Sequence, residues 1–173
     1  MLLNDVDQML LSSLDEVAWL LNVRGCDIEY NPLIISYLLV SQDYVKWFVK
    51  KETFGSYDPD TEDSFAELKM DGVDIEDYDA IYSGIADLAD QSVKLFADPS
   101  TLNYHIYSSI SDNVPEGNVV FGKSPVILEK AVKVASEIEN MRQAYIEDGV
   151  AMERFLHWLE TEVASGRAVS EWE

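Results

Sequence analysis

The chain contains little cysteine, little histidine and little positive charge. Cys26 is the only cysteine among 173 residues, so an intrachain disulfide is impossible and a zinc site built from several cysteines is excluded. The two histidines are His105 and His157. Because neither lysine nor histidine stands beside Cys26 in the sequence to activate its thiol, we expect this cysteine to be a small buried residue.

Basic residues are outnumbered by acidic ones throughout. The chain carries 12 Lys and Arg against 33 Asp and Glu, for a net charge of −21. The charge is −17 over residues 1–122 and −4 over residues 123–173. A field of this sign repels phosphate groups, so we expect the chain to bind neither nucleic acid nor an anionic membrane surface.

Long hydrophobic runs are also missing. No apolar stretch reaches the ~18–20 residues that span a bilayer. The first residues, MLLNDVDQ, carry acids where a secretory signal needs basic residues. These features predict a soluble protein, with the cytoplasm as its expected location.

Strand-like and helix-like segments alternate along residues 1–122. Apolar and β-branched runs predict strands, and apolar residues at helical spacing predict helices. The strands are expected at 8–11, 33–40, 44–50, 72–75 (an edge strand), 92–97 and 119–121, and the later helices at 64–70, 77–89 and 101–110. A turn at residues 41–43 joins two strands as a hairpin, and a polar loop is expected at 51–63. The pattern predicts an α/β fold with a mixed β-sheet flanked by helices.

The first expected helix follows Ser13. Ser13 and Glu16 have the spacing of a capping box, in which each side chain bonds the other residue's backbone N–H. Val17, Leu20 and Leu21 fall on one face of this short helix. Gly25 is the expected end of the helix.

A long amphipathic helix is predicted over residues 136–164. Ser136 and Glu139 have capping-box spacing, and Gly166 is the expected stop. One face carries apolar residues at spacings of three, four and seven: Ile138, Met141, Tyr145, Met152, Leu156, Leu159 and Val163. A further start signal at Ser170 lies so close to the end of the sequence that we expect a truncated C-terminus.

Two blocks of sequence resemble the long, three-domain Xaa-Pro aminopeptidases of the creatinase and prolidase superfamily. Residues 14–40 read LDEVAWLLNVRG followed by NPLIISYLLV, and residues 130–163 read KAVKVASEIENMRQAYIEDGVAMERFLHWLETEV. The resemblance implies a creatinase N-terminal-like α/β domain at residues 1–122. Residues 123–173 would be a connector and the first helix of a truncated "pita-bread" metallopeptidase domain.

The same resemblance implies the parent's chemistry. Family members remove the N-terminal residue that precedes proline, using a metal-activated water. Two metal ions, commonly manganese, are held by two Asp, two Glu and a His. None of those ligand motifs occurs in this sequence, so we expect a fragment with no catalytic or metal-binding residue of its own. The implied role is a scaffold that flanks the active site or supports oligomer contacts.

The partners implied for the parent are a peptide with proline at its second position, the remaining catalytic domain and, as one arrangement, a second copy in a homodimer. Two alternatives remain open. One is a stand-alone, non-enzymatic binding module with the same fold. The other is a fragment of a creatinase-like hydrolase with a different substrate.

Four residues are candidates for interdomain or subunit contacts: Asn22, Arg24, His157 and Trp158. For Arg24 we favour a simpler role at the end of the first helix, paired with an acid such as Asp27. His157 and Trp158 are expected to line a contact between the long helix and a domain. His105, Trp19 and Trp47 are expected to be structural.

Overall fold

The computed structural model describes residues 6–50, 66–89 and 92–172. The chain divides into two compact units, residues 1–130 and 131–173, and each is described by itself. The polar loop expected at residues 51–63 lies outside the described residues, as does the start of the helix expected at 64–70; residues 66–70 are helical.

The first unit is built on a mixed sheet that has six strands within the described residues, in the order β4-β3-β2-β1-β5-β6. The strands β1 and β2 are antiparallel, as are β2 and β3, whereas β3–β4, β1–β5 and β5–β6 are parallel pairs. Their bounds are β1 (Gln8–Leu11), β2 (Ser36–Ser41), β3 (Val45–Val49), β4 (Val73–Asp77), β5 (Leu95–Ala97) and β6 (Val119–Phe121). The mixed sheet, the hairpin and the edge position of β4 are confirmed.

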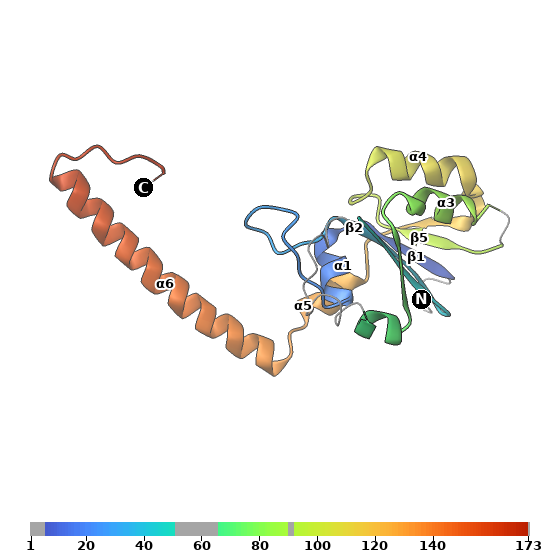
Figure 1. Ribbon diagram of the computed structural model, residues 1–173, viewed down its shortest axis with the longest axis horizontal. Helices are drawn as coiled ribbons and strands as arrows, with labels where there is room; N and C mark the ends of the chain where they lie inside the picture. The colour runs from blue at the N-terminus through green and yellow to red at the C-terminus, as the bar shows by residue number, and fades with distance from the viewer. Residues whose placement is uncertain (1–5, 51–65, 90–91, 173) are drawn as a thin grey trace. The chain divides into compact units, whose positions relative to one another are not determined.

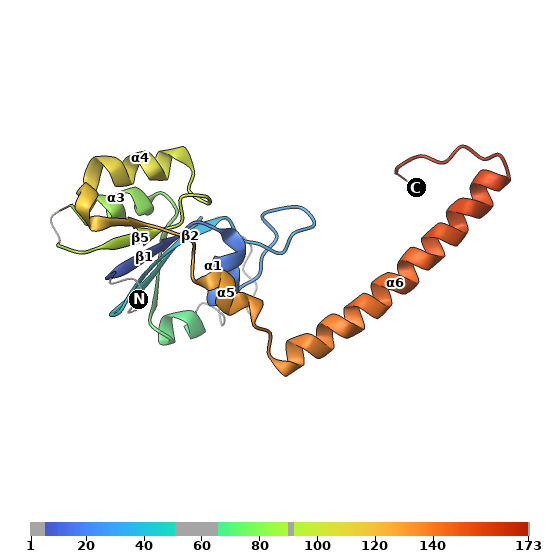
Figure 2. The same ribbon diagram turned by 180° about the vertical axis from the view of Figure 1, so that it is seen from behind.

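Helices cover both faces of this sheet (Figures 1 and 2). The helices α3 (Ala80–Ala86) and α4 (Tyr104–Asn113) lie on one face, and α1 (Leu14–Leu20) and α5 (Val126–Ala131) lie on the other. Neighbouring strand residues point to opposite faces. Leu10 and Leu39 therefore join the core beneath α3 and α4, while Leu11 and Leu38 join the core beneath α1.

The sheet side chains explain much of the unit's stability. Trp47 and Phe48 are adjacent in β3, and both are buried, one in each core. Full burial of a large apolar side chain contributes about 1.5–3 kcal/mol relative to its exposure. Because successive side chains of β1, β2 and β3 point to opposite faces, the same strands pack against the helices on both sides of the sheet.

The start of α1 differs from the prediction. The Ser13 hydroxyl donates a 2.6 Å hydrogen bond to Asp15 Oδ1, and Glu16 points into the protein, where it accepts from Ser124. The capping box of Ser13 and Glu16 is therefore wrong. The helix also ends at Leu20, before Gly25, and leaves Leu20 exposed.

The helix α5 was not foreseen. The prediction placed only a connector after residue 122, but residues 126–131 form a helix whose Val126 is buried in the core beneath α1. The side chain of Lys130 bonds Asp15. This short segment is too brief for a periodic pattern to reveal it.

The second unit consists mainly of α6 (Ala135–Ala164), which matches the predicted long helix. The residue before it is Val134, whose N–H donates to Glu137 Oε2 at 2.9 Å, so the capping box at Ser136 and Glu139 is wrong. The helix ends at Ala164, as predicted, and the residue that stops it is Gly166, which has φ 79. Its N–H bonds Val163 O, and the Arg167 N–H bonds Glu162 O, which is a Schellman motif.

No residue of α6 is buried, although its apolar face carries large side chains such as Met141, Phe155 and Leu156. Residues 167–172, as far as the chain is described, are not helical. The helix start expected at Ser170 is therefore not seen.

Candidate functional site: a braced loop, a buried polar cluster and an edge cavity

A loop at residues 22–35 follows α1 and presents an aromatic residue at its tip. Tyr30 is 98% exposed and has φ 60, in the left-handed region that bulky residues avoid. The Asn31 N–H donates to Ile28 O at 3.1 Å and closes the turn around Tyr30. Asn22, with φ 52, makes the first bend; asparagine tolerates this conformation.

The base of the loop is braced by side chains. Arg24 Nη1 donates to Ala18 O at 2.9 Å and to Val23 O at 2.8 Å. Asp27 Oδ2 accepts the Ile35 N–H at 2.8 Å. Arg24 therefore serves the end of α1, as expected, but through carbonyl oxygens: the pairing with Asp27 is wrong because Asp27 holds the other side of the loop.

Cys26 lies in this loop and is exposed. The expectation of a buried cysteine is wrong. The reason is that α1 ends at Leu20, so the residues around position 26 leave the core earlier than the predicted helix would have allowed.

His157 and Trp158 lie in the second unit, on α6. The His157 side chain is exposed, and the Trp158 ring lies 6.0 Å from the Phe155 ring. Asn22 and Arg24 belong to the first unit. The role of these four residues in interdomain or subunit contacts stays a prediction.

His105, Trp47 and Trp19 each pack against other side chains of the first unit. His105 stacks on Tyr82, with ring centroids 4.3 Å apart. Trp47 is fully buried, and Trp19 packs half-buried against the core beneath α1. These positions agree with the structural roles expected for them.

A buried polar cluster, which sequence reasoning missed, lies where β1, β5 and β6 end. Glu16, Asp98 and Ser124 are 3%, 4% and 3% exposed. Ser124 Oγ donates to Glu16 Oε2 at 2.5 Å, and the Ser124 N–H donates to Asp98 Oδ2 at 3.0 Å. Polar residues directly after parallel strands were the available signal, because the carboxyl ends of such strands meet at one edge of the sheet.

The two acids of this cluster differ in electrostatics. Burial raises the pKa of Glu16, the charges of Asp15 and Asp98 add to the rise, and the bond from Ser124 offsets part of it. Burial acts to raise the pKa of Asp98 as well. Hydrogen bonds from Ser100 and Ser124, with the charge of Lys123, outweigh burial and lower that pKa.

A dinuclear metal centre does not fit the residues that the structure describes. Within them, no three His, Cys, Asp or Glu side chains gather in a group that could hold a metal ion. The buried carboxylates of Glu16 and Asp98 are already engaged by serine hydroxyl and backbone donors. Among the described helices, none has the length and hydropathy of a membrane span.

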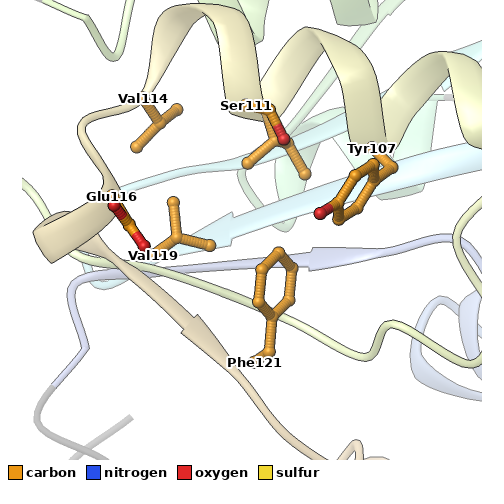
Figure 3. A pocket seen from close by; sticks show the side chains of 7 residues that line it. Tyr107, Ser111, Val114, Glu116, Val119 and Phe121 are labelled. Atoms are coloured by element: carbon orange, nitrogen blue, oxygen red, sulfur yellow. The ribbon is translucent and has the colours of Figure 1, made fainter.

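A cavity of about 500 Å³ opens between α4 and β6, close to the short helix η3 (Glu116–Asn118) (Figure 3). Its lining combines two aromatic rings, apolar side chains and one acid: Tyr107, Ile110, Ser111, Val114, Glu116, Val119 and Phe121. The Tyr107 and Phe121 rings are stacked, 6.0 Å apart at 26°. The cavity can hold a side chain or small molecule at an open edge of the sheet.

Residues 1–137 match the family model described as the Creatinase/Prolidase N-terminal domain. The chain belongs to this family. The α/β fold with its mixed sheet and long C-terminal helix agrees with that assignment.

Relatives of this creatinase-family chain include long peptidases. It is 33% identical to Xaa-Pro aminopeptidase 1 of Dictyostelium discoideum and 36% identical to Xaa-Pro aminopeptidase 2 of Rattus norvegicus. Both alignments cover 91% of this chain and 23% of the relative. The chain therefore spans about a quarter of the length of these relatives.

Solved structures give the same relationship. The X-prolyl aminopeptidase of Caenorhabditis elegans, described as a cytosolic enzyme with a di-nuclear active site, is 33% identical with a TM-score of 0.77. That alignment covers 94% of this chain and 26% of the nematode enzyme. The Xaa-Pro dipeptidase of Bacillus anthracis shares the fold, with a TM-score of 0.61 at 18% sequence identity. That alignment covers 88% of this chain and 39% of the dipeptidase.

Proposed function

We propose that this chain is the supporting, non-catalytic part of a metal-dependent Xaa-Pro aminopeptidase, a hydrolase that removes the N-terminal residue preceding proline. The observation that carries the proposal is the alignment: nearly the whole chain matches only 23% to 26% of such enzymes. In the parent, peptides with proline at the second position are the substrates, and the remaining polypeptide performs the hydrolysis.

Within this proposal, residues 1–122 form the creatinase N-terminal-like domain, and residues 123–173 form a connector and the first helix of the catalytic domain. The thirty residues of α6 support the second assignment. None is buried, yet one face is apolar along its length. An amphipathic helix is stabilised mainly by packing of that face, and we assign the remaining catalytic domain as the surface that covers it.

The two divalent metal ions of the parent, manganese by family resemblance, belong to that remaining portion of the polypeptide. A cytoplasmic location is proposed from the nematode relative, which is described as cytosolic. The net charge of −21 supports the expectation that neither nucleic acid nor an anionic membrane is a partner.

Contacts between domains or subunits are proposed at Asn22, Arg24, His157 and Trp158. In the first unit, the bonds of Arg24 and Asp27 hold both sides of the loop that displays Tyr30. Arg24 would thus act as a positioning residue for the loop tip. A homodimer remains one arrangement that such contacts could serve.

A stand-alone binding module is the second candidate function. The architecture of the first unit favours this candidate. The unit has two buried hydrophobic cores and a sheet covered on both faces, which is the layered architecture of an independently folding domain.

The gene downstream of Glu173 separates the two functions. Two Asp, a His and two Glu in the family's order would support the peptidase. A stop codon directly after Glu173 would favour the binding module. If the ligands are present, a protein extended through them should release the first residue of an Xaa-Pro peptide in the presence of Mn²⁺. A different substrate for that extended protein would favour the creatinase-like hydrolase.

A further inference from the structure

The cavity between α4 and β6 contains three polar groups that the fold does not use. They are the hydroxyls of Tyr107 and Ser111 and the carboxylate of Glu116. Within the described residues, none of these side-chain groups has a hydrogen-bond or ion-pair partner. Polar groups grouped around an apolar hollow are typical of a binding site.

The shape and chemistry of the cavity suit a cation on an apolar stem. Tyr107 and Phe121 are 43% and 45% exposed, and their stacked rings stand at one end, with Glu116 at the other (Figure 3). Aromatic faces attract ammonium and guanidinium groups, and arginine also stacks on them. Ile110, Val114 and Val119 provide apolar surface for the methylene groups of such a side chain.

The strand beside the cavity has an open edge. In the described sheet, β6 is the last strand and pairs only with β5. The Gly122 N–H donates to Ala97 O at 3.2 Å. Because backbone groups alternate in direction along a strand, the N–H and C=O of Phe121 point away from β5. An extended peptide can pair with such an edge.

The edge and the cavity are continuous. Val119 and Phe121 are two positions apart, so their side chains share the face of the sheet that α4 covers, and both line the cavity. Every second side chain of a strand added to β6 would lie on that same face. One of them would therefore enter the cavity.

We propose that the β6 edge and its cavity bind an extended peptide segment that places an arginine or lysine side chain between the Tyr107–Phe121 rings and Glu116. Charge complementarity selects this occupant, because the cavity carries a carboxylate and the whole chain a charge of −21. The proposal is independent of the peptidase assignment, since it concerns only this chain's own residues.

Titration of the ¹⁵N-labelled chain tests the proposal. The probe is an acetylated and amidated five-residue peptide with arginine at its centre, flanked by valine and threonine, at low salt. The amide signals of Phe121, Gly122 and Ser111 should shift. The same peptide with glutamate at its centre should bind at least fivefold more weakly. Equal binding of the two peptides, or no shift at these amides, would overturn the proposal.

Matched variants sharpen the test. Glu116→Gln and Phe121→Leu should each weaken binding about two- to fivefold, because each removes one interaction with the cation. Asp112→Asn removes a charge from the nearby helix α4, outside the lining of the cavity, and should leave binding unchanged. If Asp112→Asn weakened peptide binding as much as Glu116→Gln does, binding would depend on general charge attraction and the proposed role of the cavity would be refuted. Arginine amide that binds as tightly as the peptide would refute strand addition.

Discussion

The Ser124 hydroxyl donates a 2.5 Å hydrogen bond to Glu16, 108 positions earlier in the chain. The backbone N–H of Ser124 donates to Asp98. One residue thus joins α1, the end of β5 and the segment that enters α5. This cluster secures the last part of the first unit to its sheet.

Ser124→Ala should destabilise the first unit by about 1–3 kcal/mol, because the buried Glu16 carboxylate loses its donor. Urea unfolding followed by tryptophan fluorescence measures this. Ser83→Ala is the matched control: Ser83 bonds Ala80 O on the exposed side of α3, and its loss should change stability by less than about 0.5 kcal/mol. Equal effects of the two substitutions would contradict a structural role for the cluster.

Glu16→Gln should change how stability depends on pH. The pKa of Glu16 is raised in the folded protein, chiefly by burial, so the folded state binds this proton more tightly than the unfolded state. The stabilisation is fully present below the ordinary value of 4.5 and is lost as pH rises through the folded pKa. Asp98, with its lowered pKa, has the opposite sign and loses its contribution as pH falls.

The contribution of Glu16 is isolated by comparing the unfolding free energies of the unsubstituted chain and the Glu16→Gln variant. Relative to the unsubstituted chain, Glu16→Gln should gain stability as pH rises from about 4.5 to 7. The glutamine keeps a side-chain oxygen that accepts from Ser124. Ser83→Ala, an exposed change that removes no titratable group, should show no such trend. A difference that stays constant over this pH range would contradict a raised pKa.

Gly25→Ala should destabilise the first unit by about 1–3 kcal/mol through overpacking. A Cβ at this position would lie 2.3 Å from Cγ1 of Ile34. Gly117→Ala is the control, because a Cβ there meets nothing within 4 Å. Thermal unfolding of the double variant Gly25→Ala, Ile34→Ala should show a smaller loss of stability than the sum of the losses in the two single variants. Additive losses would mean that the overpacking does not involve Ile34.

Arg24→Ala should cost about 0.5–1.5 kcal/mol of stability, because Ala18 O loses its side-chain donor at the end of α1. Arg24→Lys keeps the charge but not the geometry of the guanidinium and should recover only part of the loss. Chemical denaturation measures both. Unchanged stability with weakened domain assembly in the parent would instead favour a direct interdomain contact by Arg24.

Tyr37→Phe should be more destabilising than Tyr78→Phe. The Tyr37 hydroxyl accepts from Asn103 Nδ2 at 2.6 Å and from the Tyr78 hydroxyl at 3.0 Å. Its removal leaves two donors unpaired, at about 1–3 kcal/mol, whereas Tyr78→Phe removes one donor. Denaturation of both variants at equal pH gives the comparison, and a larger loss in Tyr78→Phe would contradict it.

Local apolar patterns were enough to predict the strands and the long helix. The apolar run of residues 33–40 and the helical spacing of Met141, Tyr145 and Leu156 are signals of this kind. The short helix α5 and the early end of α1 could not be read in this way. Both depend on contacts with distant residues, as when Lys130 bonds Asp15.

The buried cluster shows why sites were harder to predict than strands. Glu16 has the spacing of a capping residue, and only the fold brings it to Ser124. The cavity likewise combines Tyr107 from α4 with Phe121 from β6, which no linear motif links. Cys26 was misjudged for a related reason, since its exposure follows from the path of the loop after α1.

The most direct test of the central proposal is a comparison of turnover. The 173-residue chain and a polypeptide extended to the stop codon of its gene are assayed side by side with Mn²⁺ and a peptide that has proline at its second position. We predict release of the first residue by the extended protein and none by the chain alone. Turnover by the chain alone, or a folded extended protein that leaves the peptide intact, would contradict the account.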